Sequence, residues 1–271
     1  MLYSKNKSKR LNDSLFRSPT SEYRGAPFWA WNCKLDRKTL LEQIMIFKEM
    51  GFGGFHMHVR TGLETPYLSD EFMEYIKLCN EKAIEEDMLC WLYDEDRYPS
   101  GAAGGIVTQN LHYRARHMVL SQNLYNDFEP SREKFCQLID EGHKPKGYYL
   151  ASYCVVLKDG YLAEYCRIDK NTVPDKGAVW HVYVQLAKED PWYNNQTYVD
   201  VMNRAAVERF IAVTHERYFE VLGSEFGKSI PAIFTDEPQV SRKSRLSFAA
   251  STKDVTNSFT DDLPETYRDR Y

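Results

Sequence analysis

Two adjacent carboxylates, Asp236 and Glu237, are the residues of this 271-residue chain best placed to do chemistry. They follow the apolar pair Ile233 and Phe234 and stand just before Pro238. A short apolar run bounded by prolines predicts a buried strand, and in parallel β/α proteins the reacting groups collect where strands end. Because hydrolysis of a glycosidic bond uses an acid and a carboxylate, we predict Glu237 as the acid or acid/base. Asp236 is then expected to orient the substrate or to tune the proton of Glu237.

Three other apolar segments, at residues 27–32, 53–60 and 89–96, also break off in polar side chains. Four strands with polar ends predict one shared site at the carboxyl edge of a sheet. Tyr, Phe and Trp make up 14% of the chain, which suits stacking against sugar rings as well as packing. The candidate substrate-binding residues are Trp31, Asn32, His56, His58, Arg60, Tyr93, Arg97 and, in a later polar loop, Trp192.

The second catalytic carboxylate is left open by the sequence. Adjacent residues on a strand point to opposite faces, so Asp236 and Glu237 are not expected to form the whole pair. Asp94 and Glu95 directly follow a strand core and are the candidates within the chain, and a residue beyond Tyr271 is the alternative. A helix cap or a surface ion pair is the structural role that these carboxylates would otherwise fill.

His56, His58 and Arg60 alternate along one strand, so their side chains share a face. They could donate hydrogen bonds to sugar hydroxyls or hold a carboxylate. The same spacing suits a metal-dependent hydrolase of the amidohydrolase type, in which two imidazoles bind zinc. A pair of buried core histidines and a non-catalytic carbohydrate-binding protein are the remaining alternatives.

The composition limits the partners of the chain. A net charge of -4 and a pI near 6.0 give no electrostatic reason to expect nucleic acid or an anionic membrane as a partner. The sequence contains no apolar stretch of about 20 residues that could span a bilayer, and residues 1–12 lack the apolar core of a secretory signal. The six cysteines show no C-x-x-C spacing, which favours reduced thiols and a cytoplasmic location. A carbohydrate substrate is the partner we expect.

The order of segments predicts an α/β fold. Residues 1–24 form a polar lead-in, and residues 25–116 read as strand, helix, strand, helix and strand, with a further helix from about 106 to 116. Residues 117–190 are expected to form a small antiparallel β insertion. Residues 191–271 are expected to continue the β/α fold with a helix over 198–222, the last strand, and no strong element beyond residue 241.

A (β/α)8 barrel takes about 250 residues, whereas this chain offers four parallel strands. We therefore predict a TIM-barrel-type fold of which the chain holds the first half, with an open α/β sheet as the alternative.

Four sequence blocks, at residues 27–32, 51–58, 93–101 and 234–238, resemble the catalytic barrel of bacterial glycosyl hydrolases similar to the α-L-rhamnosidases of glycoside hydrolase family 106. The resemblance runs from about Pro27 to Pro238. It implies a complete barrel with β-rich accessory domains, so the C-terminal half of the barrel is expected outside this chain. It also implies inversion and calcium, although no calcium loop is evident, and no other cofactor is expected. The Thr-Asp-Glu-Pro block also resembles the Asn-Glu-Pro acid/base block of wider barrel glycosidase groups, with Glu237 at the acid/base position and Asp236 in place of the Asn.

Overall fold

The computed structural model describes residues 9–240 and 243–271. The chain divides into two compact units, which are described separately. Unit 1 comprises Met1–Ile106 and Glu208–Pro238, and unit 2 comprises Val107–Val207 and Gln239–Tyr271. Unit 2 is larger than the insertion expected at residues 117–190, because the segments on both sides of it and the end of the chain also belong to it.

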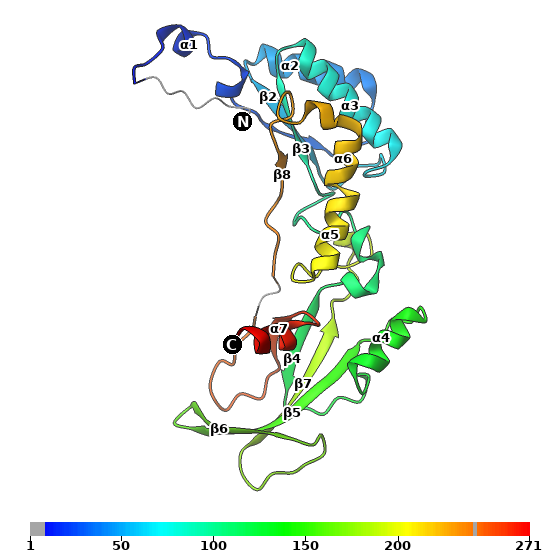
Figure 1. Cartoon of the computed structure of the whole chain (residues 1–271), viewed down its shortest axis with the longest axis vertical. Helices are drawn as coiled ribbons and strands as arrows, with labels where there is room; N and C mark the ends of the chain where they lie inside the picture. Colours follow the sequence, from blue (N-terminus) through cyan, green and yellow to red (C-terminus); the bar gives the residue numbers. More distant parts are fainter. Residues whose placement is uncertain (1–8, 241–242) are drawn as a thin grey trace. The chain divides into compact units, whose positions relative to one another are not determined.

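Unit 1 contains a parallel sheet with the strand order β1-β2-β3-β8 (Figure 1). The strands are β1 (Phe28–Trp31), β2 (Gly54–Val59), β3 (Leu89–Tyr93) and β8 (Ile233–Phe234). All four strands lie within the segments where the apolar runs predicted them. Parallel neighbours need crossover connections, which α2 (Arg37–Glu49) and α3 (Asp70–Glu85) provide between the first three strands. Between β3 and β8 the chain passes through unit 2.

Helices α2 and α3 begin where the sequence predicts, directly after the N-cap candidates Asp36 and Ser69. The side chain of Asp36 accepts a hydrogen bond from the backbone N–H of Thr39 at 3.0 Å, and Ser69 caps α3 in the same way through Phe72 at 3.2 Å. Gly51 follows α2 with a φ of +85°, a conformation that favours glycine at a helix end. The helix expected over residues 198–222 is only partly present. Residues 198–203 are not helical, and the rest forms two helices, α5 (Arg204–Val213), in which the chain returns to unit 1, and α6 (His215–Leu222). Helix α1 (Asp13–Arg17) lies within the polar lead-in.

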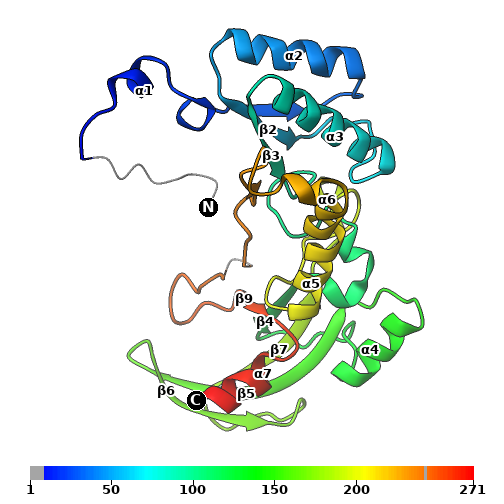
Figure 2. The ribbon, with the colours of Figure 1, turned by 45° about the horizontal axis from the view of Figure 1, so that its top comes forward.

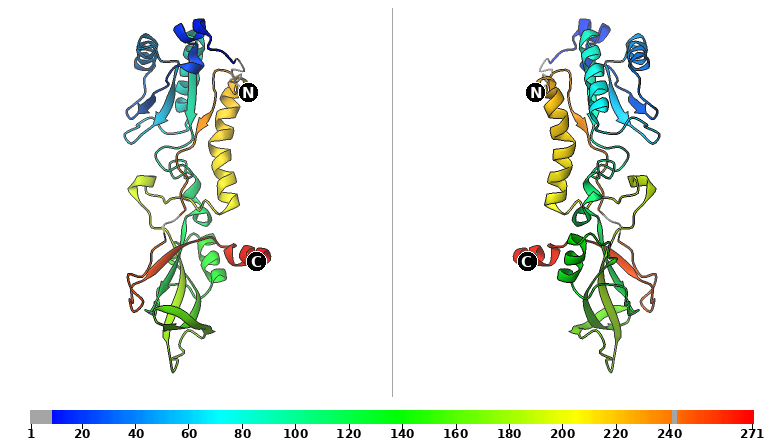
Figure 3. Two further views of the ribbon diagram at one scale, coloured as in Figure 1. Left: turned by 90° about the vertical axis from the view of Figure 1, so that its left-hand side faces the viewer. Right: turned by 90° about the vertical axis from the view of Figure 1, so that its right-hand side faces the viewer.

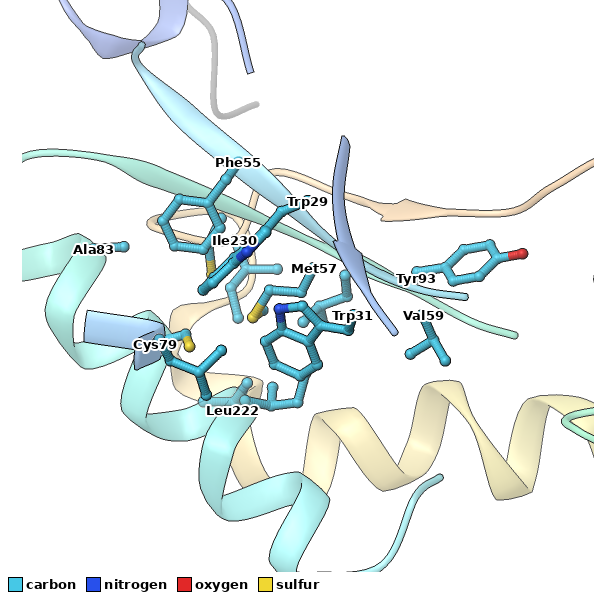
Figure 4. Packing of buried hydrophobic residues seen from close by; sticks show 14 of the residues in the cluster. Trp29, Trp31, Phe55, Met57, Val59, Cys79, Ala83, Tyr93, Leu222 and Ile230 are labelled. Atoms are coloured by element: carbon cyan, nitrogen blue, oxygen red, sulfur yellow. The ribbon is translucent and has the colours of Figure 1, made fainter. Parts of the chain in front are cut away.

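The core of unit 1 lies between one face of the parallel sheet and the helices α2, α3 and α6. Figure 4 shows Trp29, Phe55 and Met57 from the strands meeting Cys79 of α3 and Leu222 of α6. Helices α2 and α3 lie side by side (Figure 2). Because side chains alternate along a strand, the residues between these core positions point to the opposite face of the sheet.

Unit 2 contains an antiparallel sheet with the strand order β6-β5-β7-β4-β9. Its strands are β4 (Arg116–Ser121), β5 (Gly147–Lys158), β6 (Tyr161–Ile168), β7 (Ala178–Leu186) and β9 (Val255–Phe259). The Lys158-Asp-Gly160 sequence predicts a hairpin turn, and β5 and β6 pair as that hairpin. Its turn residues Asp159 and Gly160 have φ of +52° and +82°, as a tight two-residue turn requires.

Three elements of unit 2 were not predicted: α4 (Arg132–Asp140), which lies against the sheet (Figure 3), β9, and α7 (Leu263–Arg270). Strand β9 has a polar centre, Thr256-Asn-Ser258, so its sequence carries only a weak strand signal. The prediction of a helix over residues 106–116 was wrong. Two single 3₁₀ turns stand there instead, at Val107–Gln109 and Leu111–Tyr113.

The fold is mixed α/β, with a four-stranded parallel sheet and a separate five-stranded antiparallel sheet. The residues that the structure describes form no closed barrel, because β1 and β8 pair only with β2 and β3 respectively. Within those residues, no helix is both long enough and apolar enough to cross a membrane.

Candidate active site

The carboxyl ends of the unit 1 strands lie at one edge of the sheet, because all four strands run parallel. Asn32 follows β1, Arg60 follows β2, Asp94 follows β3 and Thr235 follows β8. Strands β3 and β8 pair Tyr93 with Phe234, so Asp94 and Thr235 are neighbours at this edge. The parallel order thus brings the predicted polar strand ends together.

Asp94 is fully buried, and both of its carboxylate oxygens are engaged. One oxygen accepts from the hydroxyl of Ser100 at 2.6 Å. The other accepts from the hydroxyl of Thr235 at 2.6 Å and lies 3.0 Å from Nε2 of His215. Asp94 therefore holds three segments of unit 1 together and is placed to orient Thr235 and His215.

Glu95 is also buried, and its carboxylate is enclosed by backbone N–H groups. One oxygen accepts from Gly101, Ala102 and Ala103 at 2.7–2.9 Å, and the other accepts from Asp96 at 2.9 Å and from Gly104. Burial raises the pKa of Glu95 to about 7, and these N–H donors act against the rise. This geometry makes Glu95 the group that shapes the loop 101–104, and the catalytic role of Glu95 stays a prediction.

The two carboxylates that follow β8, Asp236 and Glu237, differ in their contacts. The backbone N–H of Asp236 donates to the hydroxyl of Ser100, and the backbone carbonyl of Asp236 accepts from the N–H of Ser100, both at 2.8 Å. The side chain of Asp236 lies 3.4 Å from the hydroxyl of Tyr93. Burial and the charge of Asp236 raise the pKa of Tyr93, so its hydroxyl keeps its proton and donates. Glu237 is exposed, and its carboxyl group makes no hydrogen bond or ion pair with the described residues. Its φ of +42° is left-handed, which is unfavourable for a residue with a Cβ.

The sheet face opposite the helix-covered core carries imidazole and aromatic rings. His56 stacks on Trp91 with ring centroids 5.0 Å apart, and His58 stacks on Phe28 at 4.7 Å. His58 is 1% exposed, and neither of its ring nitrogens has a hydrogen-bond partner in the described part of the chain. Burial, together with the charges of Arg60 and His56, lowers the pKa of His58 to about 4. Both histidines are therefore neutral at pH 7, since burial also lowers the pKa of His56.

Two of the predicted substrate-binding residues lie elsewhere. Trp31 is 1% exposed and packs edge-on against Phe72 in the helix-covered core, so no sugar ring can stack on it there. Trp192 belongs to unit 2, where it is 44% exposed. Arg97 forms an ion pair with its neighbour Asp96, in which Nε and Nη2 of Arg97 both lie 2.7 Å from Oδ2 of Asp96. Asn32 and Arg60 are exposed at the strand ends.

Several residues of this edge were missed by the sequence reasoning. Ser100 and Thr235 lie within the segments that were singled out, but only the fold directs their hydroxyls at Asp94. His215 opens α6 and has no recognisable motif around it. Phe28 and Trp91 were read as strand core, although the alternation of side chains from His56 could have placed Trp91 on the histidine face.

Neither the calcium implied by the resemblance nor the zinc of the amidohydrolase alternative has a complete set of ligands among the described residues. Among residues 9–240 and 243–271, no group of three or more His, Cys, Asp and Glu side chains is arranged to hold a metal ion. The oxygens of Asp94 and Glu95 are occupied by protein donors, and His56 and His58 are surrounded by aromatic rings. The residues present thus do not fit the calcium that the resemblance implies or the zinc of the amidohydrolase alternative.

Comparison with known proteins adds little. No family model matches the sequence, and no curated protein does. Among solved structures, the chain is similar to a rhamnosidase from Novosphingobium sp. PP1Y, with a TM-score of 0.33 and 11% sequence identity. The match covers 64% of this chain and 26% of that chain, so this chain spans about a quarter of the length of the rhamnosidase. A likeness of this size does not define a shared fold or a shared activity.

Proposed function

We propose that unit 1 carries a glycoside hydrolase site in which Glu237 is the proton donor. The observation that carries the proposal is the contrast among the strand-end carboxylates. Those of Asp94 and Glu95 are saturated by protein donors, whereas the carboxyl of Glu237 is exposed and unengaged among the described residues. A left-handed φ costs a residue other than glycine roughly 1–2 kcal/mol, and such strain is often kept at functional sites. The φ of +42° at Glu237 fits that pattern.

Each neighbouring residue has a role in this proposal. Glu237 protonates the leaving oxygen of the glycosidic bond. Asp236, which keeps one oxygen unengaged by the described residues, stabilises the positive charge that develops on the sugar. Asp94 acts as a positioning residue, because it holds the hydroxyl of Thr235 next to Asp236.

The imidazole and aromatic face is proposed to hold the sugar. A neutral imidazole has one donor and one acceptor nitrogen, which matches a sugar hydroxyl. Phe28 is 56% exposed and offers a ring for stacking. Because Phe28 covers His58, a sugar reaches the nitrogens of His58 when this ring moves aside. The sequence blocks that resemble family 106 suggest an α-L-rhamnoside as the substrate.

We also propose that the four parallel strands are part of a (β/α)8 barrel. In such a barrel, helices cover the outer face of the sheet, and side chains fill the interior. Unit 1 has one face covered by α2, α3 and α6 and another bearing His56 and His58. The proposal assigns the second face to the barrel interior and the remaining strands and the accessory domains to the whole protein.

Two substrates with different leaving groups test the role of Glu237. An alkyl glycoside such as methyl α-L-rhamnoside needs a proton on its leaving oxygen, whereas a 2,4-dinitrophenyl glycoside does not. General acid catalysis is worth about 10²–10⁴-fold, so Glu237→Gln should lower kcat/KM by about 10³-fold for the alkyl glycoside. The same variant should retain kcat/KM to within about tenfold for the dinitrophenyl glycoside.

The matched control is Glu216→Gln, which removes the same charge from an exposed position on α6. It should leave both reactions unchanged. Equal losses on both substrates in Glu237→Gln would assign Glu237 a role other than proton donor. Absence of turnover of any glycoside by the whole protein, with the remaining barrel strands present, would refute the hydrolase assignment. Stoichiometric zinc that is lost in a His56→Ala, His58→Ala variant would support the metal-dependent alternative.

A further inference from the structure

One face of the antiparallel sheet in unit 2 is apolar along its whole length but is covered by a helix over only part of it. Strand β7 places Trp180, Val182, Val184 and Leu186 on the same face, because side chains alternate. Val184 and Leu186 pack with Phe135 of α4 in a buried cluster. Val182 and Trp180 line a pocket of about 840 Å³ to which α4 contributes no residue.

The walls of this pocket come from all five strands and are mainly aliphatic and aromatic. Strand β5 contributes Tyr153 and Val155, and β6 contributes Leu162 and Tyr165. Leu162 is 59% exposed and Tyr165 is 68% exposed. Large apolar side chains gathered on one exposed surface often mark a binding site, so we expect this surface to bind a ligand or partner.

The rim of the pocket carries positive charge. Lys243 and Arg245 line it, and neither makes an ion pair within the described part of the chain. Between them, Ser244 is fixed to β9, because its N–H donates to the carbonyl of Thr256 and its hydroxyl accepts from the N–H of Thr256, both at 2.8 Å. No Asp or Glu lines the pocket. The two cations are therefore held at the mouth of an apolar groove without a counter-charge in its lining.

We propose that this groove, bounded by Trp180, Val182, Leu162, Tyr165, Lys243 and Arg245, binds a small amphipathic anion. The apolar walls take an aromatic or acyl body, and the two rim cations take a carboxylate, sulfonate or phosphate head. A volume of about 840 Å³ lies within the range of roughly 300–1,000 Å³ found for small-molecule pockets. Sugars suit the groove less well, because eight of its fifteen lining residues are aliphatic. The site lies entirely within unit 2 and is independent of the hydrolase proposal.

A pair of fluorescent probes tests both halves of this proposal. 1-Anilinonaphthalene-8-sulfonate is an aromatic anion, and N-phenyl-1-naphthylamine is the same molecule without the sulfonate. Titrated into the whole chain, both probes should bind, the sulfonate more tightly. The double variant Lys243→Glu, Arg245→Glu should weaken binding of the sulfonate about tenfold and change binding of the neutral probe less than twofold. Leu162→Lys, at an exposed position that does not support the core, should weaken binding of both probes.

The matched control is Lys253→Glu, a charge reversal at an exposed position of unit 2 outside the pocket. It should leave both titrations unchanged, and circular dichroism should show every variant folded. Sulfonate binding that is unaffected by the rim reversal would overturn the proposal. A self-association that Leu162→Lys abolishes would overturn it as well, because a second copy of the chain would then cover the groove.

Discussion

Unit 1 leaves one face of its sheet without a helix over it among the described residues, whereas unit 2 leaves part of one face uncovered, and these two surfaces differ in chemistry. In unit 1 that face carries His56 and His58 among aromatic rings, next to an edge where carboxylates gather. In unit 2 it is an apolar groove with Lys243 and Arg245 at its rim.

The difference follows from strand direction. Parallel strands end at the same edge, so the polar residues after each strand meet there. Antiparallel strands end alternately at opposite edges, so no single edge collects them. A binding surface in such a sheet is therefore built from the face, whose residues alternate with buried ones. For this reason unit 1 can place carboxylates side by side at one edge, whereas unit 2 offers mainly shape and apolar surface.

The largest loss of stability is expected from substituting Glu95, whose buried carboxylate is enclosed by backbone N–H groups of unit 1. Glu95→Gln removes the carboxylate that accepts five backbone N–H groups and leaves several of them unpaired. At about 1–3 kcal/mol for each unsatisfied buried group, we expect a loss of more than about 3 kcal/mol. Hydrogen-exchange mass spectrometry should show faster exchange in peptides covering residues 94–105 and unchanged exchange in the strands of unit 2. Glu164→Gln, at an exposed site of β6, should change neither; equal acceleration in both units would contradict a local role.

The counterpart in unit 2 is a buried ion pair. Arg116 is 2% exposed and lies 3.0 Å from Asp261, and it donates to backbone carbonyls of residues 112 and 114. Breaking a buried pair costs about 3–5 kcal/mol. Since Asp261 keeps the hydroxyl of Tyr148 at 3.1 Å, we expect Arg116→Met to cost about 3 kcal/mol. The expected readout is faster exchange in β4 and β9 with the loop 94–105 unchanged. Faster exchange of that loop would show that the two units respond as one.

His58→Phe is expected to stabilise unit 1 and to impair sugar binding. The substitution removes two buried ring nitrogens that lack partners among the described residues, each of which costs about 1–3 kcal/mol. A gain of about 1–3 kcal/mol, measured by denaturant unfolding at pH 7, together with a raised KM, is the predicted outcome. Lower stability would mean that the nitrogens of His58 have partners such as bound water.

The same variant should change the response to acid. The folded-state pKa of His58 is about 4 against an ordinary value of 6.5, so the folded state binds this proton less tightly than the unfolded chain. The stability linked to His58 is therefore fully present above pH 6.5 and is lost as the pH falls toward 4, by at most about 1.4 kcal/mol per pH unit. Stability measured between pH 6.5 and 4 should fall less steeply in His58→Phe than in the parent chain. Parallel slopes would refute this titration.

The smallest effect concerns the rim of the unit 2 groove. Ser244→Ala removes the hydroxyl that accepts from the N–H of Thr256 but keeps the backbone bond between them. We expect a local loss of about 0.5–1.5 kcal/mol, seen as faster exchange in peptides covering residues 243–249. Ser258→Ala, on β9 like Thr256 but outside the groove, should leave these peptides unchanged. An unchanged exchange rate in Ser244→Ala would show that this bond does not fix the rim.

Local patterns were enough to predict the strands of unit 1 and the starts of α2 and α3. Apolar runs bounded by glycine or proline marked β1, β2, β3 and β8, and Asp36 and Ser69 cap helices as their positions suggested. These features depend on a residue and its near neighbours in the chain. The Lys158-Asp-Gly160 hairpin is of the same kind, because its turn is set by two residues with positive φ.

The sheet faces and the pairing of distant segments could not be predicted in this way. Trp31 was expected to contact a substrate but faces the core. All four residues of β1 are apolar, so the sequence has no polar alternation to show that Trp29 and Trp31 are buried while Phe28 and Ala30 are exposed. Strand β9 is a strand because β4 pairs with it, since its own residues are largely polar.

By itself, the sequence determined where carboxylates, imidazoles and aromatic residues stand relative to strand ends, because those relations are local. Only the tertiary structure decided which carboxylates remain available. It closes five backbone N–H groups on Glu95, brings Ser100, Thr235 and His215 to Asp94, and leaves Glu237 exposed. The physical reason is that hydrogen-bond partners far apart in the chain meet only after the sheet has formed, and those partners decide whether a charged group supports the fold or remains available for chemistry.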